Sequence, residues 1–444
     1  MEGYFVLEQP LCLTAQKRRH REQDHYLEVT FVVHPIPQAV QIGWAIDGIQ
    51  MKGERRLAVQ MMPLCNKSIL LWESIPQLFF VKKVKRKNYL NNFLILLLSV
   101  ACAPNTPNSP FDFPANGLPE FNLSSKKYYY PEVLNPMHVK QKGEYLILME
   151  IYRIPPEKPL IHLINKTTLS YFSAKGITGF GPNEIANAEL FDPGFDPNTF
   201  WIYSSRSKRM SEFSLLDTNR LSISEFRQPE GMFMIYNLYF TKDSTFLGIS
   251  ASDPNRLIEL DYSGNRVNAY GTWEKIADRS DLDDYLLGEL NKGWFRANSK
   301  KTIYVKASIF RDRLEIFDYR TKEFVLVDGP RLELPKFKIS GSGANSALIF
   351  NPEEAYGHRD IAFGESYIYD LYGGFNEAQI QQSNVIAKTI FVLTDKGEMV
   401  AKLNLDRSLR SISVDETMGK IYGITTDADP GIAVFDIPKD LLEK

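Results

Sequence analysis

Residues 314–327 read Leu-Glu-Ile-Phe-Asp-Tyr-Arg-Thr-Lys-Glu-Phe-Val-Leu-Val. Apolar residues recur on both sides of Thr321-Lys322, a pattern typical of two antiparallel strands joined by a tight turn. The first half of this stretch has five counterparts elsewhere in the chain. The six apolar segments, each a candidate strand, cover residues 160–164, 210–213, 257–261, 314–318, 390–393 and 432–436. An internal repeat therefore organises the chain.

A second strand type precedes each of these segments and follows a turn rich in Gly, Asn, Asp or Ser. Its six copies cover residues 145–149, 200–203, 246–249, 303–306, 367–371 and 421–424. Equivalent positions recur at intervals of roughly 45 to 65 residues, as expected for four-stranded blades with loop insertions. One blade has too little apolar surface to be stable alone, so successive sheets must pack radially. We therefore predict an all-β fold, a six-bladed β-propeller with four-stranded antiparallel blades, over residues 120–444.

The two ends of the repeat complement each other. The last unit stops near Ile437 without a clear fourth strand, whereas residues 126–130 precede the first unit and have no partner in it. We expect this early segment to close the ring by pairing with the last blade. A β-sandwich would use similar strands but would not explain six copies of one order. Between blades, residues 280–288 predict a short capped helix.

Several pieces of the chain, taken in order, resemble the TolB-like six-bladed propeller lipoproteins of Bacteroidetes. They cover residues 179–185, 314–319, 367–374 and 421–424. The resemblance extends over about residues 130–440. It implies a propeller of the cell envelope, and it supplies no catalytic residues.

Residues 81–101 have the order of a lipoprotein signal peptide. The basic residues 82–87 precede the apolar residues 93–98, a run too short for a permanent transmembrane helix. The sequence Leu98-Ser-Val-Ala-Cys102 resembles the bacterial lipobox, which makes Cys102 the predicted lipidation site. The alternative is a buried cysteine at the end of a core strand or helix. The Pro-, Asn- and Ser-rich start of residues 102–119 favours the lipobox, because it predicts a tether.

This signal sequence predicts a lipid-anchored protein of the cell envelope, on the outer membrane and facing the periplasm. The absence of Asp at position 103 fits outer-membrane sorting. Residues 1–80 do not fit, because a signal peptide starts near the N-terminus. We interpret them as a non-native or disordered upstream extension that results from an over-extended reading frame. A genuine extra N-terminal segment is the alternative.

Charge and composition argue against several classes of partner. Residues 102–444 carry 39 Lys and Arg against 46 Asp and Glu, a net charge of −7. Such a surface lacks the basic footprint that binds phosphate backbones, so we expect no nucleic-acid partner. The three histidines of this part, at positions 138, 162 and 358, have no metal-binding spacing. We predict no metal site and no cofactor.

A weak ligand-binding candidate is the run His358-Arg359-Asp360. It precedes residues 361–363, the predicted innermost strand of the fifth unit, and we expect it in a loop at one mouth of the propeller. There it could hold an anion or a polar ligand. The alternative is a salt-bridged loop with a structural role alone.

The loop Gly181-Pro182-Asn183-Glu184 suggests a phosphate loop at first sight, but the Lys-Ser/Thr ending is missing. We assign it a structural role. Glycine permits positive φ, proline fixes a turn, and Asn183 or Glu184 can bond to neighbouring backbone.

These observations predict a binding or scaffold propeller, attached to the membrane through its lipid anchor, with an envelope protein or a small ligand such as a glycan as its partner. We expect no catalytic residues. The alternative is a hydrolase or lyase of a sugar or lactone with an axial calcium ion, which requires inward-facing carboxylates from at least three blades. A third hypothesis is a purely structural partner of a membrane protein.

Overall fold

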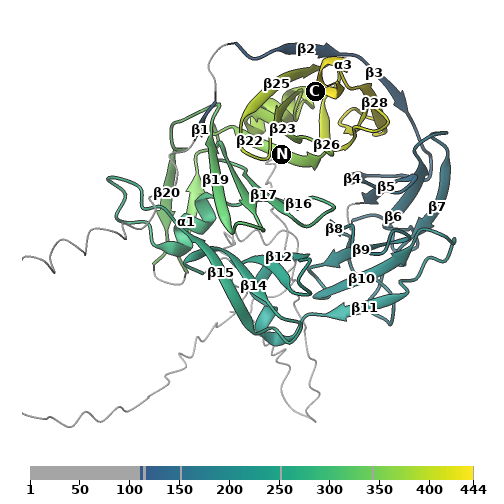
Figure 1. Ribbon diagram of the computed structural model, residues 1–444, viewed down its shortest axis with the longest axis horizontal. Coiled ribbons are helices and arrows are strands. Elements are labelled where there is room, and N and C mark those ends of the chain that lie inside the picture. The colour runs from purple at the N-terminus through teal and green to yellow at the C-terminus, as the bar shows by residue number, and fades with distance from the viewer. Residues whose placement is uncertain (1–110, 114–116, 151–152, 251–252, 343–344, 444) are drawn as a thin grey trace, which may run out of the picture. The chain divides into compact units, whose positions relative to one another are not determined.

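Six of the seven sheets in the described part of the chain are arranged around a common axis, and the seventh is a two-stranded hairpin (Figure 1). The computed structural model describes residues 111–113, 117–150, 153–250, 253–342 and 345–443. Each sheet has a core of four antiparallel strands, of which the first lies nearest the axis, except that the last sheet takes its outer strand from elsewhere in the chain. The predicted all-β, six-bladed propeller is therefore confirmed.

The first three blades are each built from four consecutive strands. Blade 1 contains β4 (Pro136–Lys142), β5 (Tyr145–Glu150), β6 (Ile161–Asn165) and β7 (Tyr171–Lys175). Blade 2 contains β8 (Leu190–Asp192), β9 (Thr199–Ser204), β10 (Arg209–Ser214) and β11 (Ser224–Arg227). Blade 3 contains β12 (Ile235–Phe240), β13 (Phe246–Ser250), β14 (Asn255–Leu260) and β15 (Arg266–Thr272).

The next two blades follow the same plan, and the sixth is assembled from both ends of the fold. Blade 4 contains β16 (Gly293–Ala297), β17 (Ile303–Ser308), β18 (Arg313–Asp318) and β19 (Glu323–Asp328). Blade 5 contains β22 (Tyr356–Phe363), β23 (Ile368–Phe375), β24 (Thr389–Leu393) and β25 (Met399–Leu405). Blade 6 contains β26 (Leu409–Asp415), β27 (Lys420–Thr425), β28 (Ile432–Asp436) and β3 (Ser125–Tyr128).

Strand β3 closes the ring. It pairs antiparallel with β28, so that Ser125 lies opposite Phe435 and Tyr128 opposite Ile432. The pairing confirms the prediction that a segment before the first blade completes the last one. Closure gives blade 6 the four antiparallel strands that form the core of every other blade.

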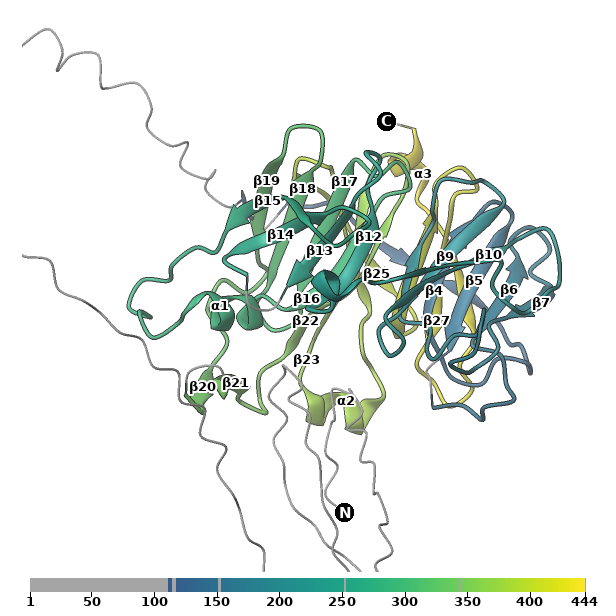
Figure 2. The ribbon, with the colours of Figure 1, turned by 90° about the horizontal axis from the view of Figure 1, so that it is seen from below.

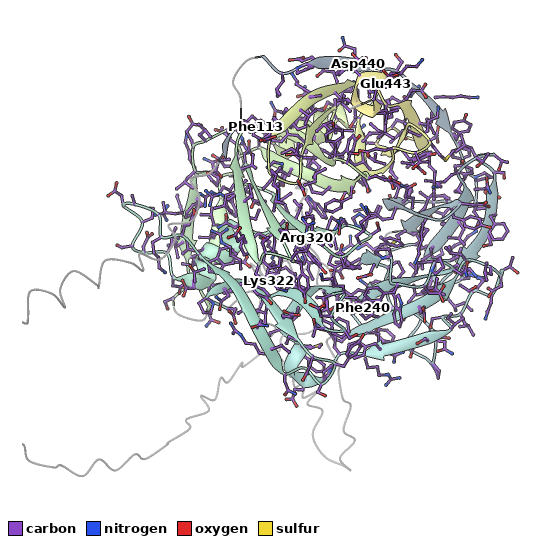
Figure 3. The ribbon with its side chains drawn as sticks, viewed as in Figure 1. Phe113, Phe240, Arg320, Lys322, Asp440 and Glu443 are labelled. Atoms are coloured by element: carbon purple, nitrogen blue, oxygen red, sulfur yellow. The ribbon has the colours of Figure 1, made fainter. Side chains whose placement is uncertain are left out.

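Two further strands run along the outer edge of the ring. Strand β1 (Phe111–Asp112) pairs parallel with β19, and β2 (Glu120–Leu123) pairs parallel with β25. Phe113, labelled in Figure 3, packs with its ring centroid 4.7 Å from that of Phe391. Its backbone N–H donates to the Asp328 carbonyl at 3.0 Å. This part of the segment predicted as a tether is thus docked on the propeller.

Apolar clusters fill the spaces between neighbouring blades. One cluster joins Leu146 of blade 1 to Tyr422 of blade 6, and another joins Ile147 of blade 1 to Phe200 of blade 2. The cluster across blades 2 to 4 is rich in aromatic rings, including Tyr239. Since each sheet buries both faces against its neighbours, radial packing supplies the core, as the weakness of an isolated blade requires.

The two faces of the propeller differ in the length of their connections (Figure 2). The loop face bears the connections between blades and those between second and third strands. Its long segments are residues 176–189, 228–234, 273–292, 329–342, 345–355 and 376–388. The opposite turn face bears mostly short hairpin turns, and also the short helix α3 (Lys439–Leu442).

Regular structure on the loop face consists of short elements. They are the 3₁₀ turn η1 (Glu230–Met232), helix α1 (Asp284–Leu290), the hairpin β20 (Phe337–Ser340) with β21 (Ala347–Phe350), and helix α2 (Glu377–Ser383). Helix α1 confirms the predicted inserted helix. Asp283 caps its first turn by accepting a hydrogen bond from the Leu286 N–H at 2.9 Å.

Candidate functional site: polar side chains at the propeller axis

Asp360 lies near the axis on β22 and contacts three other blades. Lys140 Nζ, from β4, lies 2.9 Å from Asp360 Oδ2, and Arg296 Nη2, from β16, lies 2.9 Å from Oδ1. Ser411 Oγ, from β26, donates to Oδ2 at 2.5 Å. One carboxylate therefore joins blades 1, 4, 5 and 6.

The charges around Asp360 keep it ionised. Burial opposes the charged form, but Lys140 and Arg296 outweigh it and hold the pKa of Asp360 well below its ordinary range. Burial in turn lowers the pKa of Lys140 to about 8, against the opposing effect of Asp360. Loss of this carboxylate would leave Lys140 and Arg296 without a counter-charge, which is strongly destabilising for buried ions.

Asp192 has a similar role at the turn-face end of the axis. It is the last residue of β8, and its Oδ1 lies 2.6 Å from Lys301 Nζ, in the turn after β16; both side chains are fully buried. Its Oδ2 accepts the Phe240 N–H at 3.0 Å, and its Oδ1 accepts the Gly194 N–H at 2.7 Å. Asp192 therefore joins blades 2, 3 and 4. Together, the two axial aspartates link all six blades.

Other cations near Asp360 have weaker partners. Arg410, on β26, donates to Met137 Sδ at 2.8 Å, and thioether sulfur is a weak acceptor. The guanidinium of Arg359, on β22, lies over the Tyr356 ring at 5.0 Å, and its buried Nε has no hydrogen-bond partner among the described residues. Burial lowers the pKa of Arg359 to about 10, and the charge of Arg410 adds to this effect.

The structure places His358, Arg359 and Asp360 inside β22, so the predicted loop at this point is wrong. Register shifts on both sides of His358 break the alternation of the strand, which is why only the apolar residues after it looked strand-like. His358 is fully buried, and its Nδ1 lies 2.8 Å from Asp370 Oδ2. Burial opposes a charge on His358, but Asp370 prevails and raises the pKa of His358. Of the three residues, only Arg359 is partly exposed.

The loop 181–184 is held by internal hydrogen bonds. Glu184 Oε2 accepts the Gly181 N–H at 2.9 Å, and the Asn183 carbonyl accepts the Ser222 N–H of blade 2 at 3.0 Å. Asn183 has a φ of +62°, and Pro182 is exposed at the tip. These contacts fix the loop over the junction between blades 1 and 2.

Sequence reasoning missed Asp192, Lys301, Lys140 and Arg296. They come from four different segments, and nothing in their local spacing indicates that they meet. The signal available is a charged residue inside an otherwise apolar inner strand, as in Trp294-Phe-Arg296. Such a residue has to find a partner across the axis, because an unpaired charge in the core is costly.

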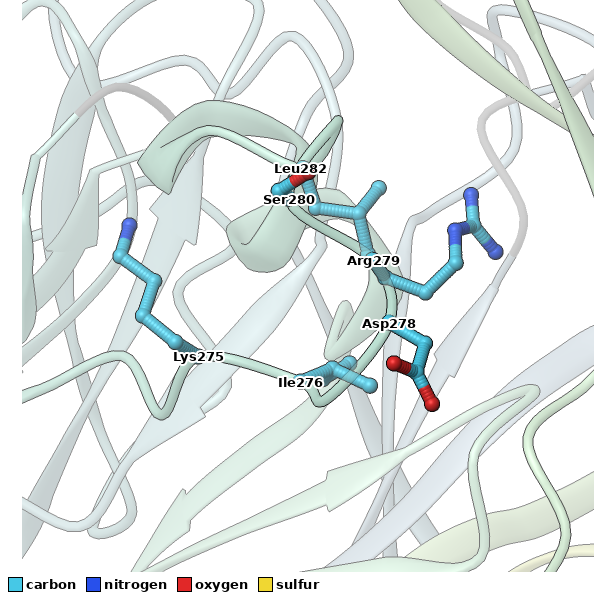
Figure 4. A pocket seen from close by; sticks show the side chains of 6 residues that line it. All are labelled: Lys275, Ile276, Asp278, Arg279, Ser280 and Leu282. Atoms are coloured by element: carbon cyan, nitrogen blue, oxygen red, sulfur yellow. The ribbon is translucent and has the colours of Figure 1, made fainter.

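A shallow hollow of about 560 Å³ lies beside α1 on the loop face (Figure 4). It is lined by Lys275, Ile276, Asp278, Arg279, Ser280 and Leu282. Its cations are already engaged, since Lys275 Nζ lies 2.9 Å from Asp284 Oδ1 and Arg279 Nε lies 2.9 Å from Asp281 Oδ1. Both cations that line the hollow are therefore already paired with carboxylates.

Within the described ranges, no group of three or more His, Cys, Asp or Glu side chains is arranged to hold a metal ion. The axial-calcium hypothesis required carboxylates from at least three blades to converge. No helix in the described part of the chain is long and apolar enough to cross a bilayer. The predicted lipidation site Cys102, the signal peptide 81–101 and the upstream segment 1–80 lie outside the described residues.

Six radially packed sheets, joined at the axis by buried carboxylates, define a protein of the six-bladed β-propeller class. The chain belongs to the TolB-like propeller family, because the family model for the TolB-like 6-blade propeller matches residues 113–417. The family expected from the sequence motifs is thereby confirmed. A search of curated proteins gives no match.

Solved structures with the same general fold include two proteins from Bacteroides. A member of the DUF4221 family from Bacteroides vulgatus is 12% identical over 72% of this chain and 98% of its own, with a TM-score of 0.46. A protein of Bacteroides fragilis described as exported is 12% identical over 73% and 98%, with a TM-score of 0.45. The Cps50 (Swd1) propeller domain of Myceliophteria thermophila is 9% identical over 71% and 100%, with a TM-score of 0.38.

Proposed function

We propose that the chain is a lipid-anchored binding propeller of the cell envelope and that its loop face binds a partner protein. The observation that carries this proposal is the difference between the two faces. Long inserted segments gather on the loop face, whereas the turn face has mostly short hairpins. Binding residues concentrate on loops that a rigid scaffold holds in place.

Ion pairs at strand ends hold these segments firmly. Arg331, in the connection after blade 4, makes a two-pronged contact with Asp312, with Nη2 2.6 Å from Oδ1 and Nε 2.9 Å from Oδ2. Arg313 Nη1 lies 2.7 Å from Glu274 Oε2, at the start of the α1 segment. Loops anchored in this way lose little conformational entropy on binding, which favours recognition of a partner protein.

Three apolar side chains are exposed on two neighbouring segments of the loop face. Phe180 is 61% exposed, Phe233 49% and Met234 44%. The two segments meet at the turn between β9 and β10, where Lys208 Nζ donates to the Phe233 carbonyl at 3.2 Å and Arg209 Nη2 donates to the Phe180 carbonyl at 3.2 Å. Aromatic residues and methionine are enriched in protein interfaces, so this surface fits a protein better than a glycan.

The test is crosslinking and co-purification from envelope extracts with the double variant Phe180→Ser and Phe233→Ser. We expect a specific partner to co-purify with the wild-type chain and to be lost with the double variant. The matched control is Leu216→Ser, since Leu216 is 74% exposed in the connection between β10 and β11, away from Phe180 and Phe233 in sequence. Equal recovery with all three chains would contradict the proposal. Binding of soluble glycans without any protein partner would favour the small-ligand alternative instead.

Cys102 is the proposed attachment point, and the tether after it would hold the propeller off the membrane. A diacylglycerol thioether and an N-acyl chain would supply the several acyl chains that stable anchoring requires. The variant Cys102→Ser should shift from the membrane fraction to the soluble fraction and should lose metabolic labelling by an alkyne fatty acid. Membrane association of the Cys102→Ser chain would disprove the anchor while leaving the binding proposal open to its own test.

A further inference from the structure

We propose that the loop-face end of the axis is a binding site for a small oxyanion, a molecule bearing a carboxylate or a phosphate group. The site is formed by Arg359 of blade 5, Arg410 of blade 6 and His138 of blade 1. This inference does not depend on the partner protein of the loop face. It rests on polar atoms near the axis that the fold itself leaves unused.

Arg359 and Arg410 are the cations of the site. They lie on neighbouring inner strands, and both are partly exposed. Neither forms an ion pair with a carboxylate among the described residues, and the Nε of Arg359 is buried without a hydrogen-bond partner. Buried polar groups in folded proteins nearly always have partners, so an orphaned guanidinium nitrogen on an inner strand points to a ligand.

His138 contributes a neutral donor. It lies on β4, and its buried Nδ1 has no partner among the described residues. Its ring packs edge-on against Trp294, with centroids 6.1 Å apart. Burial, supported by the charge of Arg296, lowers the pKa of His138 to about 3, so the imidazole is neutral at physiological pH. A neutral imidazole next to cations can donate one hydrogen bond to an anion.

The local charge balance favours an anion over a cation or a neutral sugar. The cationic side chains near the axis are Lys140, Arg296, Arg359 and Arg410, and the carboxylates are Asp360, Asp370 and Glu377, of which Asp370 pairs with His358. Asp360 is already shared between Lys140 and Arg296. Glu377 lies near Arg359 but hydrogen-bonds to the Tyr356 hydroxyl at 3.2 Å. Two guanidinium groups thus remain to receive a ligand, and their planar donors match carboxylate and phosphate oxygens.

The test uses the full-length protein in a buffer free of polyvalent anions. Thermal unfolding and calorimetry are measured with citrate and galacturonate as carboxylate probes, and with inorganic phosphate and glucose 6-phosphate as phosphate probes. We expect at least one probe to raise Tm with its concentration and to do so beyond sodium chloride at matched ionic strength, because a ligand that binds only the folded state stabilises it. The series that responds identifies the ligand class.

Two variants remove the cations one at a time. Arg359→Gln and Arg410→Gln should each weaken binding of the responding probe by about tenfold or more, equivalent to about 1.4 kcal/mol. Arg359→Lys should have an intermediate effect, because it keeps the charge and loses the planar donors. The matched control is Arg320→Gln, in the turn between β18 and β19 (labelled in Figure 3), which should bind like the wild type.

Near-UV circular dichroism shows whether each variant is folded. No Tm response of the wild type to any of the four probes would overturn the proposal. An equal response of wild type, Arg359→Gln and Arg410→Gln would overturn it as well, because binding would then occur elsewhere. Should one variant fail to fold, the other still decides the matter, because the two cations lie on different blades.

Discussion

The two axial aspartates differ in what surrounds them. At the turn-face end, Asp192 accepts from Lys301 and two backbone N–H groups, and both members of the ion pair are excluded from solvent. Further toward the loop face, the Asp360 carboxylate is equally well satisfied, but Arg359 and Arg410, on β22 and the neighbouring β26, have no carboxylate partner among the described residues. At the turn-face end, Asp192 and Lys301 are paired with each other. Toward the loop face, two cations have no carboxylate partner among the described residues.

This difference distinguishes polar groups that stabilise the fold from polar groups that are available to bind a ligand. A buried charge that is fully paired contributes to the definition of one fold, and its loss leaves the partner uncompensated. A partly exposed cation that lacks a partner contributes little to the fold and remains free for a ligand. If the distinction holds, substitutions along the axis should have graded effects on stability, largest at Asp192 and smallest at Arg410.

The largest effect is expected for Asp192→Ala. The substitution leaves the Lys301 ammonium buried without a counter-charge, so we expect a loss of about 3–5 kcal/mol in the free energy of unfolding. Equilibrium unfolding in urea measures it. As a control, Asp436→Ala removes a carboxylate that is 82% exposed in its pair with Lys420 and should change stability by less than about 1 kcal/mol. A loss at Asp192 no larger than the control would erase the contrast between the two ends.

Asp360→Asn should have the next largest effect, about 2–3 kcal/mol at pH 7, because the amide removes the charge shared by Lys140 and Arg296 and replaces one acceptor oxygen by an NH₂ donor. This effect depends on pH. The pKa of Asp360 in the folded state lies below the ordinary value of about 3.9. The stabilisation is therefore present above that pH and is lost as the pH falls below it. The difference in Tm between wild type and Asp360→Asn should be smaller at pH 3 than at pH 7.

A constant Tm difference between wild type and Asp360→Asn across this pH range would mean that the carboxylate charge is not what joins the four blades.

His358→Gln serves as a comparison in which the pH dependence has the opposite sign. Asp370 raises the pKa of His358 despite burial, so the stabilisation from its charge is present at acidic pH and is lost as the pH rises through the folded-state pKa.

Tyr304→Phe tests the turn-face end of the axis with a smaller change. The Tyr304 hydroxyl is buried and donates to the Phe240 carbonyl at 3.0 Å, which ties blade 4 to blade 3. Its removal leaves that carbonyl without this donor, so we expect a loss of about 1 kcal/mol by urea unfolding. Tyr129→Phe is the control, because Tyr129 is 59% exposed. Identical stabilities of the two variants would show that the hydroxyl adds nothing to the junction.

The smallest effect is expected for Arg410→Gln, within about 0.5 kcal/mol of the wild type in the absence of ligand. Arg296→Gln is the matched comparison on the same axis, and it should be clearly less stable because Arg296 pairs with Asp360. A loss of stability in Arg410→Gln as large as that in Arg296→Gln would mean that Arg410 has a structural partner. The loop-face end of the axis would then resemble the turn-face end.

The fold was predictable because its signal repeats. Segments such as 257–261, 314–318 and 432–436 carry the same alternation, and each became a third strand. The closing strand was also predictable, since a blade lacking one strand requires a partner. The axial aspartates were not, because the proximity of Asp192 to Lys301 and of Asp360 to Lys140 depends on the ring as a whole. His358 was misplaced for a local reason, since a bulge hides the strand from periodicity.

Closure of the ring by β3 and β28 has a consequence for biogenesis. The paired residues Ser125 and Phe435 lie about 310 positions apart, so the final contact cannot form until nearly the entire propeller has been synthesised. Such distant pairings are slow to form, because much chain entropy is lost before the contact is made. A nascent chain that cannot complete its ring stays unfolded longer. The same strand that seals the propeller would thus delay its folding until almost all of the chain has been synthesised.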